Sequence, residues 1–154
     1  MNIKGKKSKN LQLFYYKHRY GLLLCSRIQS GFMKGVAVER IKSHADWFFE
    51  NYICPQFEIE TKHIFPILDN NYFGVKKVIS QYRRLNRLFK NKYVNNTSRS
   101  LNLIEEELER HIRFEEQVLF QEIHNVATGL QLKKIQNLYT DEKFKDDFKD
   151  EFWQ

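Results

Sequence analysis

Apolar residues recur every three or four positions along most of the chain, the spacing that places side chains on one face of an α-helix. Four such stripes run over residues 11–32, 41–67, 75–89 and 101–123. Val118 is one of the apolar residues on the last stripe. Polar or glycine-containing stretches separate the stripes. The pattern therefore predicts four long helices.

One proline and the ends of the chain complete this prediction. Pro55 lies inside the second stripe and is expected to bend or divide that helix, because proline lacks a backbone N–H and clashes with the preceding turn. Residues 130–139 favour a short fifth helix, residues 141–154 form an acidic tail that we expect to dock through its aromatic rings, and residues 1–10 form a basic tail. Four helices joined by short breaks predict one all-α domain over residues 11–140, an antiparallel up-down-up-down four-helix bundle.

The composition fits one globular domain. The 154 residues are 42% hydrophobic and 15% aromatic with only 6 Gly and 2 Pro, which excludes a disordered chain and argues against a turn-rich β fold. Cys25 and Cys54 are too few for a disulfide framework and are expected to be reduced thiols. No apolar run approaches the roughly 20 residues that span a bilayer. Charges interrupt residues 11–24, where a signal peptide would be apolar, so we expect a cytoplasmic protein.

Positive charge is concentrated in two stretches of the chain, whose net charge is +7. Residues 1–45 carry ten Lys or Arg against one acid, and a second basic stretch without any acid lies between Asp69 and Glu105. Such fields can attract nucleic acid or an anionic membrane. A solubilising tail and one solvated helix face account for the charge more simply. We therefore expect no membrane partner and keep nucleic-acid binding only as a weaker hypothesis.

Polar residues interrupt every stripe well inside its helix. They are His18 on the first, Gln56 and Glu60 on the second, Tyr82 on the third, and His111, Glu115 and Glu116 on the fourth. Packed together, the four helices would bring these groups into one polar belt. Burying a carboxylate or an imidazole without a partner costs on the order of several kcal/mol, so the belt must satisfy itself.

Two solutions satisfy such a belt. A metal ion turns carboxylates and neutral imidazoles into ligands, and helix bundles build metal sites from Glu and His one turn apart on facing helices. Alternatively, a hydrogen-bond network forms in which Tyr82 donates to Glu60, and His111 and Gln56 complete it. Both solutions indicate a shared central site.

Four stretches carry a resemblance to a known family: KHRYGLLLCSRI at 17–28, PQFEIETKHIFPIL at 55–68, QYRRLNRLF at 81–89 and EEELERHIRFEEQVLFQEI at 105–123. In this order and spacing the chain resembles the hemerythrin-like (HHE cation-binding) family, in particular its small bacterial stand-alone members. The resemblance implies an antiparallel four-helix bundle with a non-haem iron pair, or one metal, at its centre. Members bind oxygen, sense oxygen or nitric oxide, store iron or repair damaged iron centres.

Matched residue by residue, the resemblance implies candidate metal ligands on three helices. His18 falls on the family's first-helix histidine, and Glu60 falls on the carboxylate of its second-helix HxxxE motif. His111 falls on the fourth-helix histidine, and the acid that follows it in the family falls on Glu116 or Glu115. The resemblance therefore implies iron, as one ion or a pair, as the cofactor.

Two further positions depart from the family pattern. Gln56 stands where the HxxxE motif has His, and Tyr82 stands where the family has its third-helix His. A Gln amide is a poor neutral oxygen donor, and Tyr binds well mainly as a phenolate to a ferric ion. A di-iron pair, a single or unusual metal site and a metal-free bundle all stay open, with His63 as a conceivable extra ligand.

The expected function follows from this incomplete site. We expect a hemerythrin-like protein that binds or senses metal, oxygen or nitric oxide through a non-haem iron-type site. The alternative is a metal-free bundle that acts as a structural or interaction module. The sequence contains no nucleophile–base arrangement and no phosphate-binding Gly-rich loop. We therefore assign no catalytic residue, and any turnover would be metal redox chemistry.

Overall fold

A computed structural model describes residues 3–69, 71–90, 96–140 and 144–154, and the side chains described are those from His18 onward apart from 139 and 140. Throughout these residues the regular secondary structure is helical, with no strand, so the predicted all-α class is confirmed. The side chains of residues 11–17 in the first predicted stripe, and residues 141–143 of the predicted tail, lie outside the described part.

The described chain contains seven α-helices. They are α1 (Ile3–Met33), α2 (Val38–Phe48), α3 (Cys54–Ile59), α4 (Phe73–Phe89), α5 (Thr97–Phe114), α6 (Phe120–Val126) and α7 (Gly129–Thr140). Helix α1 begins at Ile3, so it includes residues 3–10, which the hydrophobic pattern left outside the helices. Helix α7 covers the predicted short fifth helix.

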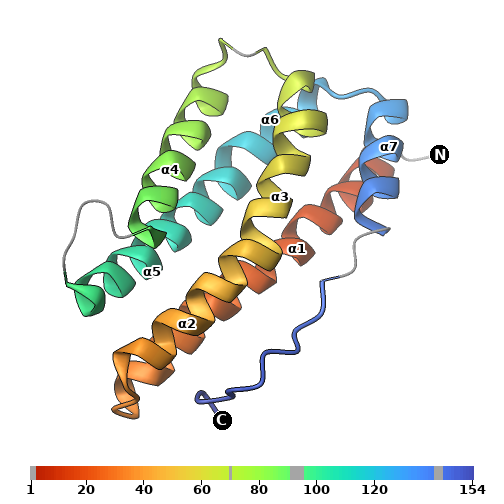
Figure 1. Ribbon diagram of the computed structural model, residues 1–154. Helices are drawn as coiled ribbons and strands as arrows, with labels where there is room; N and C mark the ends of the chain where they lie inside the picture. The colour runs from red at the N-terminus through yellow and green to blue at the C-terminus, as the bar shows by residue number, and fades with distance from the viewer. Residues whose placement is uncertain (1–2, 70, 91–95, 141–143) are drawn as a thin grey trace.

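Three π-helical turns join these helices into longer rods. Phe49–Ile53 joins α2 to α3, Glu60–Ile64 extends α3 into a 3₁₀ turn at Phe65–Ile67, and Glu115–Leu119 joins α5 to α6. A π turn widens a helix without breaking it, so the second and fourth predicted stripes form an α2–α3 rod and an α5–α6 rod (Figure 1). Pro55 lies in the first turn of α3, directly after a π turn, where its missing N–H is tolerated.

Short connections between the helices carry the expected capping groups. The side chain of Asn96 accepts a hydrogen bond from the backbone N–H of Arg99 at 3.1 Å, which caps the start of α5. Gly35, between α1 and α2, has a φ of +67°, a left-handed conformation that favours glycine. Before α7, Thr128 and Gln131 exchange hydrogen bonds between side chain and backbone. Local sequence therefore fixes where these helices begin and end.

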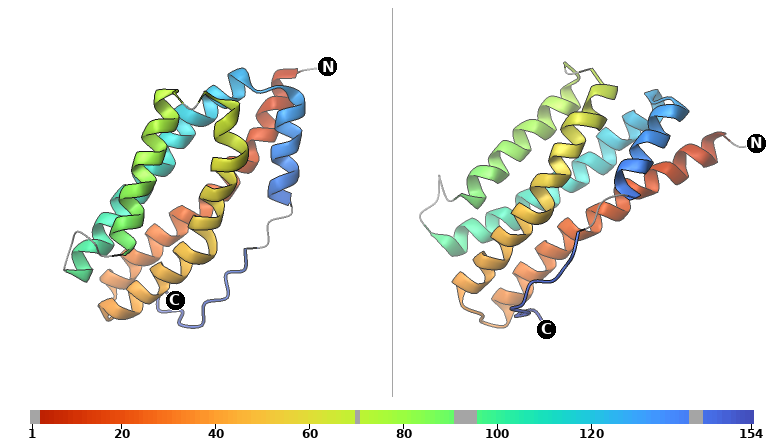
Figure 2. Two further views of the ribbon diagram at one scale, coloured as in Figure 1. Left: turned by 45° about the horizontal axis from the view of Figure 1, so that its top comes forward. Right: turned by 45° about the vertical axis from the view of Figure 1, so that its right-hand side comes forward.

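The rods and the remaining long helices lie side by side. Helix α1 contacts both rods and α7, and α4 packs on α5. The views in Figures 1 and 2 agree on this arrangement and place α7 beside the N-terminal part of α1. None of the described helices combines the length and the apolar character needed to cross a membrane.

Buried apolar side chains form two separate clusters along these rods. On the α5–α6 rod, Ile112 belongs to the first cluster and Leu119 to the second. On the α2–α3 rod, Ile53 belongs to the first cluster and Ile64 to the second. Of the polar residues predicted to form a belt, Gln56 and Glu60 lie in the sequence between Ile53 and Ile64, Glu115 and Glu116 lie between Ile112 and Leu119, and His111 directly precedes Ile112. The belt therefore occupies the boundary between two apolar clusters.

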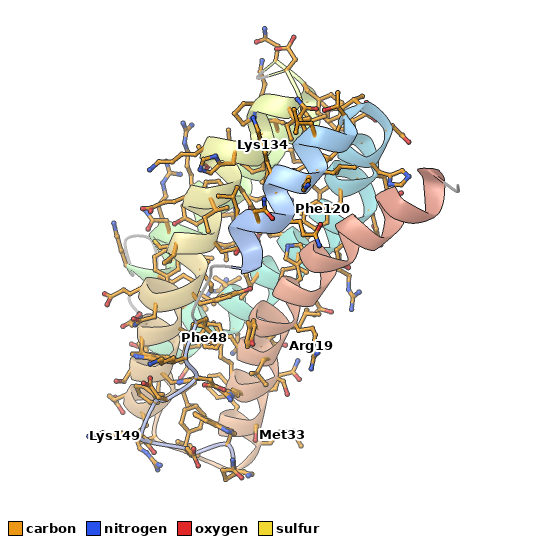
Figure 3. The ribbon with its side chains drawn as sticks, turned by 90° about the vertical axis from the view of Figure 1, so that its right-hand side faces the viewer. Arg19, Met33, Phe48, Phe120, Lys134 and Lys149 are labelled. Atoms are coloured by element: carbon orange, nitrogen blue, oxygen red, sulfur yellow. The ribbon has the colours of Figure 1, made fainter. Side chains whose placement is uncertain are left out.

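Residues 144–154, named the C-terminal strap below, run along α1 and α2 in a non-helical conformation (Figures 1 and 3). Phe152 of the strap is only 6% exposed and joins the first apolar cluster. The predicted docking of the tail through its aromatic rings is confirmed for this segment.

One histidine is enclosed beneath the strap. His44 of α2 is 0% exposed, and its ring centroid lies 4.7 Å from that of Phe148 and 4.6 Å from that of Trp153. Its Nε2 atom lies 3.3 Å from Nη1 of Arg27 on α1. Burial, together with the positive charge of Arg27, lowers the pKa of His44 to about 4.

We predict that the free energy of unfolding falls as the pH drops from 6.5 to 4. The folded-state pKa of His44 lies below the ordinary value of 6.5, so in this range the unfolded chain binds a proton that the folded chain does not. The contribution of neutral His44 to the free energy of unfolding is complete above pH 6.5. It falls by about 3 kcal/mol by about pH 4. Urea unfolding across this range measures the effect. The variant His44→Phe cannot be protonated there and should lose most of this pH dependence; an unchanged profile would contradict the assignment.

Candidate metal centre

Two of the three π turns begin at a buried carboxylate. Glu60 and Glu115 are each the first residue of a π turn, and these residues are 2% and 1% exposed. Such turns are frequent at functional sites. The wide turn also rotates the residues that follow, so Leu119 is fully buried and Val118, predicted to lie on the apolar stripe, is only half-buried.

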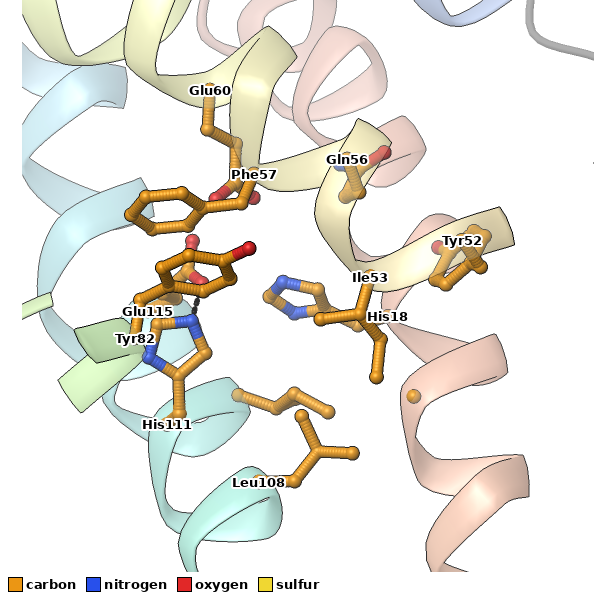
Figure 4. Close-up of a pocket in the computed structure, with 12 residues that line it drawn as sticks. His18, Tyr52, Ile53, Gln56, Phe57, Glu60, Tyr82, Leu108, His111 and Glu115 are labelled. Atoms are coloured by element: carbon orange, nitrogen blue, oxygen red, sulfur yellow. Dashed lines mark ion pairs between the residues drawn. The ribbon is translucent and has the colours of Figure 1, made fainter. Parts of the chain in front are cut away.

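His18 of α1 meets these two carboxylates in the centre of the protein. One ligand atom from each of His18, Glu60 and Glu115 lies within 4.8 Å of the other two, and all three side chains are buried. Figure 4 shows the three side chains converging from α1 and the two rods. We name these residues the central cluster. It could hold a metal ion.

Hydrogen bonds to the Nδ1 atoms hold the imidazole rings of His18 and His111 in place. Nδ1 of His18 lies 3.2 Å from a carboxylate oxygen of Glu116, and Nδ1 of His111 lies 3.0 Å from Oε1 of Gln81. An oxygen on Nδ1 favours the tautomer whose Nε2 lone pair is available to a metal. Nε2 of His111 lies 2.7 Å from Oε1 of Glu115, so His111 extends the central cluster.

The imidazoles also stabilise the charge on Glu115. Burial alone would raise the pKa of Glu115, but the nearby His111 and His18 hold this pKa below its usual range. Its second oxygen, Oε2, is buried and has no hydrogen-bond partner among the described residues. Leaving a buried carboxylate oxygen without a donor is costly. The donor atoms present therefore fit a cation at this oxygen.

Tyr82 does not occupy the place that was predicted for it. Its hydroxyl lies 2.9 Å from Sγ of Cys54, and its ring stacks on Phe57 with the centroids 3.7 Å apart. The partner of this hydroxyl is therefore Cys54, where Glu60 was predicted. Burial and the hydrogen bond with Cys54 raise the pKa of Tyr82, which keeps it a neutral phenol.

The other residues that were predicted as site candidates lie outside the central cluster. Glu116 contacts His18 from outside the central cluster, and Gln56 is a buried residue that lines the adjoining cavity. His63 is exposed and lies in a separate groove beside Lys134 of α7. The structure therefore brings His18, Glu60, Glu115 and His111 together, and it does not bring His63 to them.

A small cavity of about 40 Å³ adjoins the central cluster (Figure 4). Its apolar walls include Ile53, Leu108 and Ile112. A methyl group on Gly21 would lie 2.6 Å from Cδ1 of Ile112, so this glycine lets α1 approach α5 closely, one turn after His18. The cavity has room for one or a few molecules of the size of water.

Sequence reasoning missed two residues of this site. Gln81 lies three residues after the buried Val78 and four before the buried Leu85, so it is a polar residue on the apolar side of α4, and this signal could have identified it. Cys54 carries no comparable signal. Both Cys54 and Cys25 are free in the structure, as expected for thiols.

No family model, no curated protein and no solved structure matches this chain. The fold and the site define the protein as an all-helical protein with a buried His/Glu cluster that could hold a metal ion.

We predict that His111→Leu and Glu115→Leu each lower the free energy of unfolding by about 3 kcal/mol or more, because each leaves its buried partner unpaired. The loss of stability in the double variant should be smaller than the sum of the two single losses, since neither member of the pair is then left without its partner. Urea unfolding with a chelator present measures this coupling energy. The exposed pair Glu109 and Arg113, on the same helix at the same spacing, is the matched control and should show a coupling below about 0.5 kcal/mol. Equal coupling energies for the buried pair and the exposed pair would contradict the inference that burial makes the His111–Glu115 interaction strong.

Proposed function

We propose that this chain is a hemerythrin-like protein that holds a single iron ion at the central cluster and uses it to bind or sense oxygen or nitric oxide. The observation that carries the proposal is the convergence of His18, Glu60 and Glu115, with His111 beside them. The antiparallel up-down-up-down four-helix bundle belongs to the same proposal. The side-by-side packing of α1, α4 and the two rods supports it.

The chemistry of the donor atoms favours iron among the biological metals. Imidazole nitrogen and carboxylate oxygen are the ligands of non-haem ferrous sites. When bound, the iron supplies the capacity to bind a diatomic gas. The cavity of about 40 Å³ beside the cluster has the size of such a small ligand.

The substituted positions favour one ion over a pair. Gln56 supplies no imidazole, and the hydroxyl of Tyr82 is bonded to Cys54 and kept neutral. Two imidazoles and two carboxylates are enough for one ion, whereas a pair would need further nitrogen ligands and bridging carboxylates.

The surrounding residues position the ligands and exclude water. Glu116 and Gln81 hold the two rings through their Nδ1 atoms, which keeps Nε2 directed to the cluster. In the absence of metal, the 2.7 Å contact between His111 and Glu115 contains a proton. Loading the site therefore releases protons, so its affinity for metal rises as the pH rises.

The alternative is a metal-free structural or interaction module. The ion pair of His111 with Glu115 and the contact of His18 with Glu116 favour it, because they satisfy much of the polar belt without a metal. In that case the cluster is a device for specifying the fold. The metal content of the purified protein distinguishes the two functions.

We predict about one equivalent of iron in protein purified without chelators from iron-supplemented cells. The double variant Glu60→Ala/Glu115→Ala should retain the helical circular dichroism signal and lose this metal, since both carboxylate ligands are removed. The matched control is Glu58→Ala/Glu122→Ala, which removes two acids from the same rods outside the cluster and should keep the metal. Elemental analysis gives the result, and a wild-type protein with well under one equivalent would support the metal-free module.

We also predict that Tyr82→Phe keeps the metal, because the hydroxyl pairs with Cys54 and not with the central cluster. The loss of this hydrogen bond should lower the free energy of unfolding by about 1 kcal/mol. The iron-loaded wild-type protein should show no phenolate-to-iron absorption band. A visible band that disappears in Tyr82→Phe would show instead that Tyr82 is a ligand.

A further inference from the structure

The C-terminal strap binds a basic face formed by α1 and α2. Two Arg residues of this face each hold one strap carboxylate through two hydrogen bonds: Arg27 binds Asp146 at 2.9 and 2.6 Å, and Arg40 binds Asp150 at 2.9 and 2.7 Å. Paired bonds of this kind fix both the position and the orientation of a carboxylate. Lys34 adds a hydrogen bond to the backbone oxygen of Trp153 at 2.8 Å. The charges of strap and face are therefore complementary at several points.

Aromatic anchors lie between these charged contacts. The guanidinium of Arg27 lies 3.9 Å from the centroid of the Trp153 ring, and Phe152 is buried in the first apolar cluster. Phe148 packs on His44. Phe144 packs at 4.8 Å on Tyr52, which lines the central cavity. The anchors and the Arg-bound carboxylates repeat along the strap, with aromatic residues at 144, 148, 152 and 153 and the acids that the two Arg residues bind at 146 and 150.

Side chains make nearly all of the contacts between the strap and the basic face. Within the described residues, no backbone–backbone hydrogen bond joins the strap to a helix. The strap is non-helical and reaches the face through its rings, its carboxylates and the backbone oxygens near its end. These are the features of a linear peptide seated on a receptor surface. Such contacts do not depend on whether the two parts belong to one chain or to two.

We propose that the face formed by Arg27, Lys34, Arg40 and His44 is a recognition site for an acidic, aromatic chain segment, and that the strap of a second copy of this chain can fill it. The second copy carries the one sequence that the structure shows to match this face. Its strap would also place an aromatic ring against Tyr52, so the exchange would put the second copy beside the central cavity. The proposal is independent of any metal.

The test mixes two full-length variants, each of which has a weakened attachment of its own strap. The acceptor is Phe148→Ser/Phe152→Ser/Trp153→Ser, which keeps the face and removes the anchors of the strap. The donor is Arg27→Ala/Arg40→Ala, which keeps the strap and weakens the face. We expect each variant alone to be monomeric and the mixture at about 100 µM to form a 1:1 complex in native mass spectrometry.

The control donor carries Asp146→Lys and Asp150→Lys in addition and should form at least about tenfold less complex. Folded variants, as judged by circular dichroism, that give no 1:1 complex would overturn the proposal. The proposal would also be overturned if the control donor with Lys at 146 and 150 bound the acceptor as well as the first donor does.

A milder variant keeps the proposal testable if the acceptor does not fold. The full-length Asp146→Asn/Asp150→Asn protein retains every aromatic anchor, and a synthetic peptide of residues 144–154 serves as the probe. We expect this peptide to bind at least about tenfold more tightly than the same peptide with Lys at 146 and 150. Equal affinity of the two peptides, measured by fluorescence anisotropy, overturns the recognition site.

Discussion

Two carboxylates buried between the helices have to be neutralised, and much of the structure is arranged around this constraint. Glu115 pairs with His111 at 2.7 Å, and Glu60 and His18 lie within 4.8 Å of it. A buried carboxylate with no partner would cost on the order of several kcal/mol, a large share of the stability of a domain of this size. Each buried carboxylate therefore needs the other groups of the cluster, whether a proton or a metal ion completes it.

This requirement determines how the core is divided. On each rod the cluster lies where the first apolar cluster gives way to the second, so the buried apolar side chains gather on either side of it. The π turns that begin at Glu60 and Glu115 allow a carboxylate to face the centre before the apolar face resumes at Ile64 and Leu119. Gly21 then permits the close approach of α1 that brings His18 to the carboxylates.

Much of this arrangement could be predicted from the sequence, and the errors have physical causes. The helices and the polar belt followed from the three-to-four-residue spacing, which depends only on neighbours within one helix. A π turn inserts one residue into that spacing, so the stripe predicted Val118 where Leu119 is buried. The partner predicted for Tyr82 was Glu60, whereas its hydroxyl lies against Cys54 and its ring stacks on Phe57, both of which are contacts between helices. Contacts of this kind have no signature in the spacing of one helix.

The uneven charge of the chain has a structural explanation in the strap. The excess of Lys and Arg in residues 1–45 includes Arg27 and Arg40, which bind the carboxylates of Asp146 and Asp150. Part of the basic N-terminal region is therefore complementary in charge to the acidic C-terminal strap. Because Tyr52 lines the central cavity and also contacts Phe144 of the strap, the strap packs against one of the residues that form the wall of the candidate metal centre.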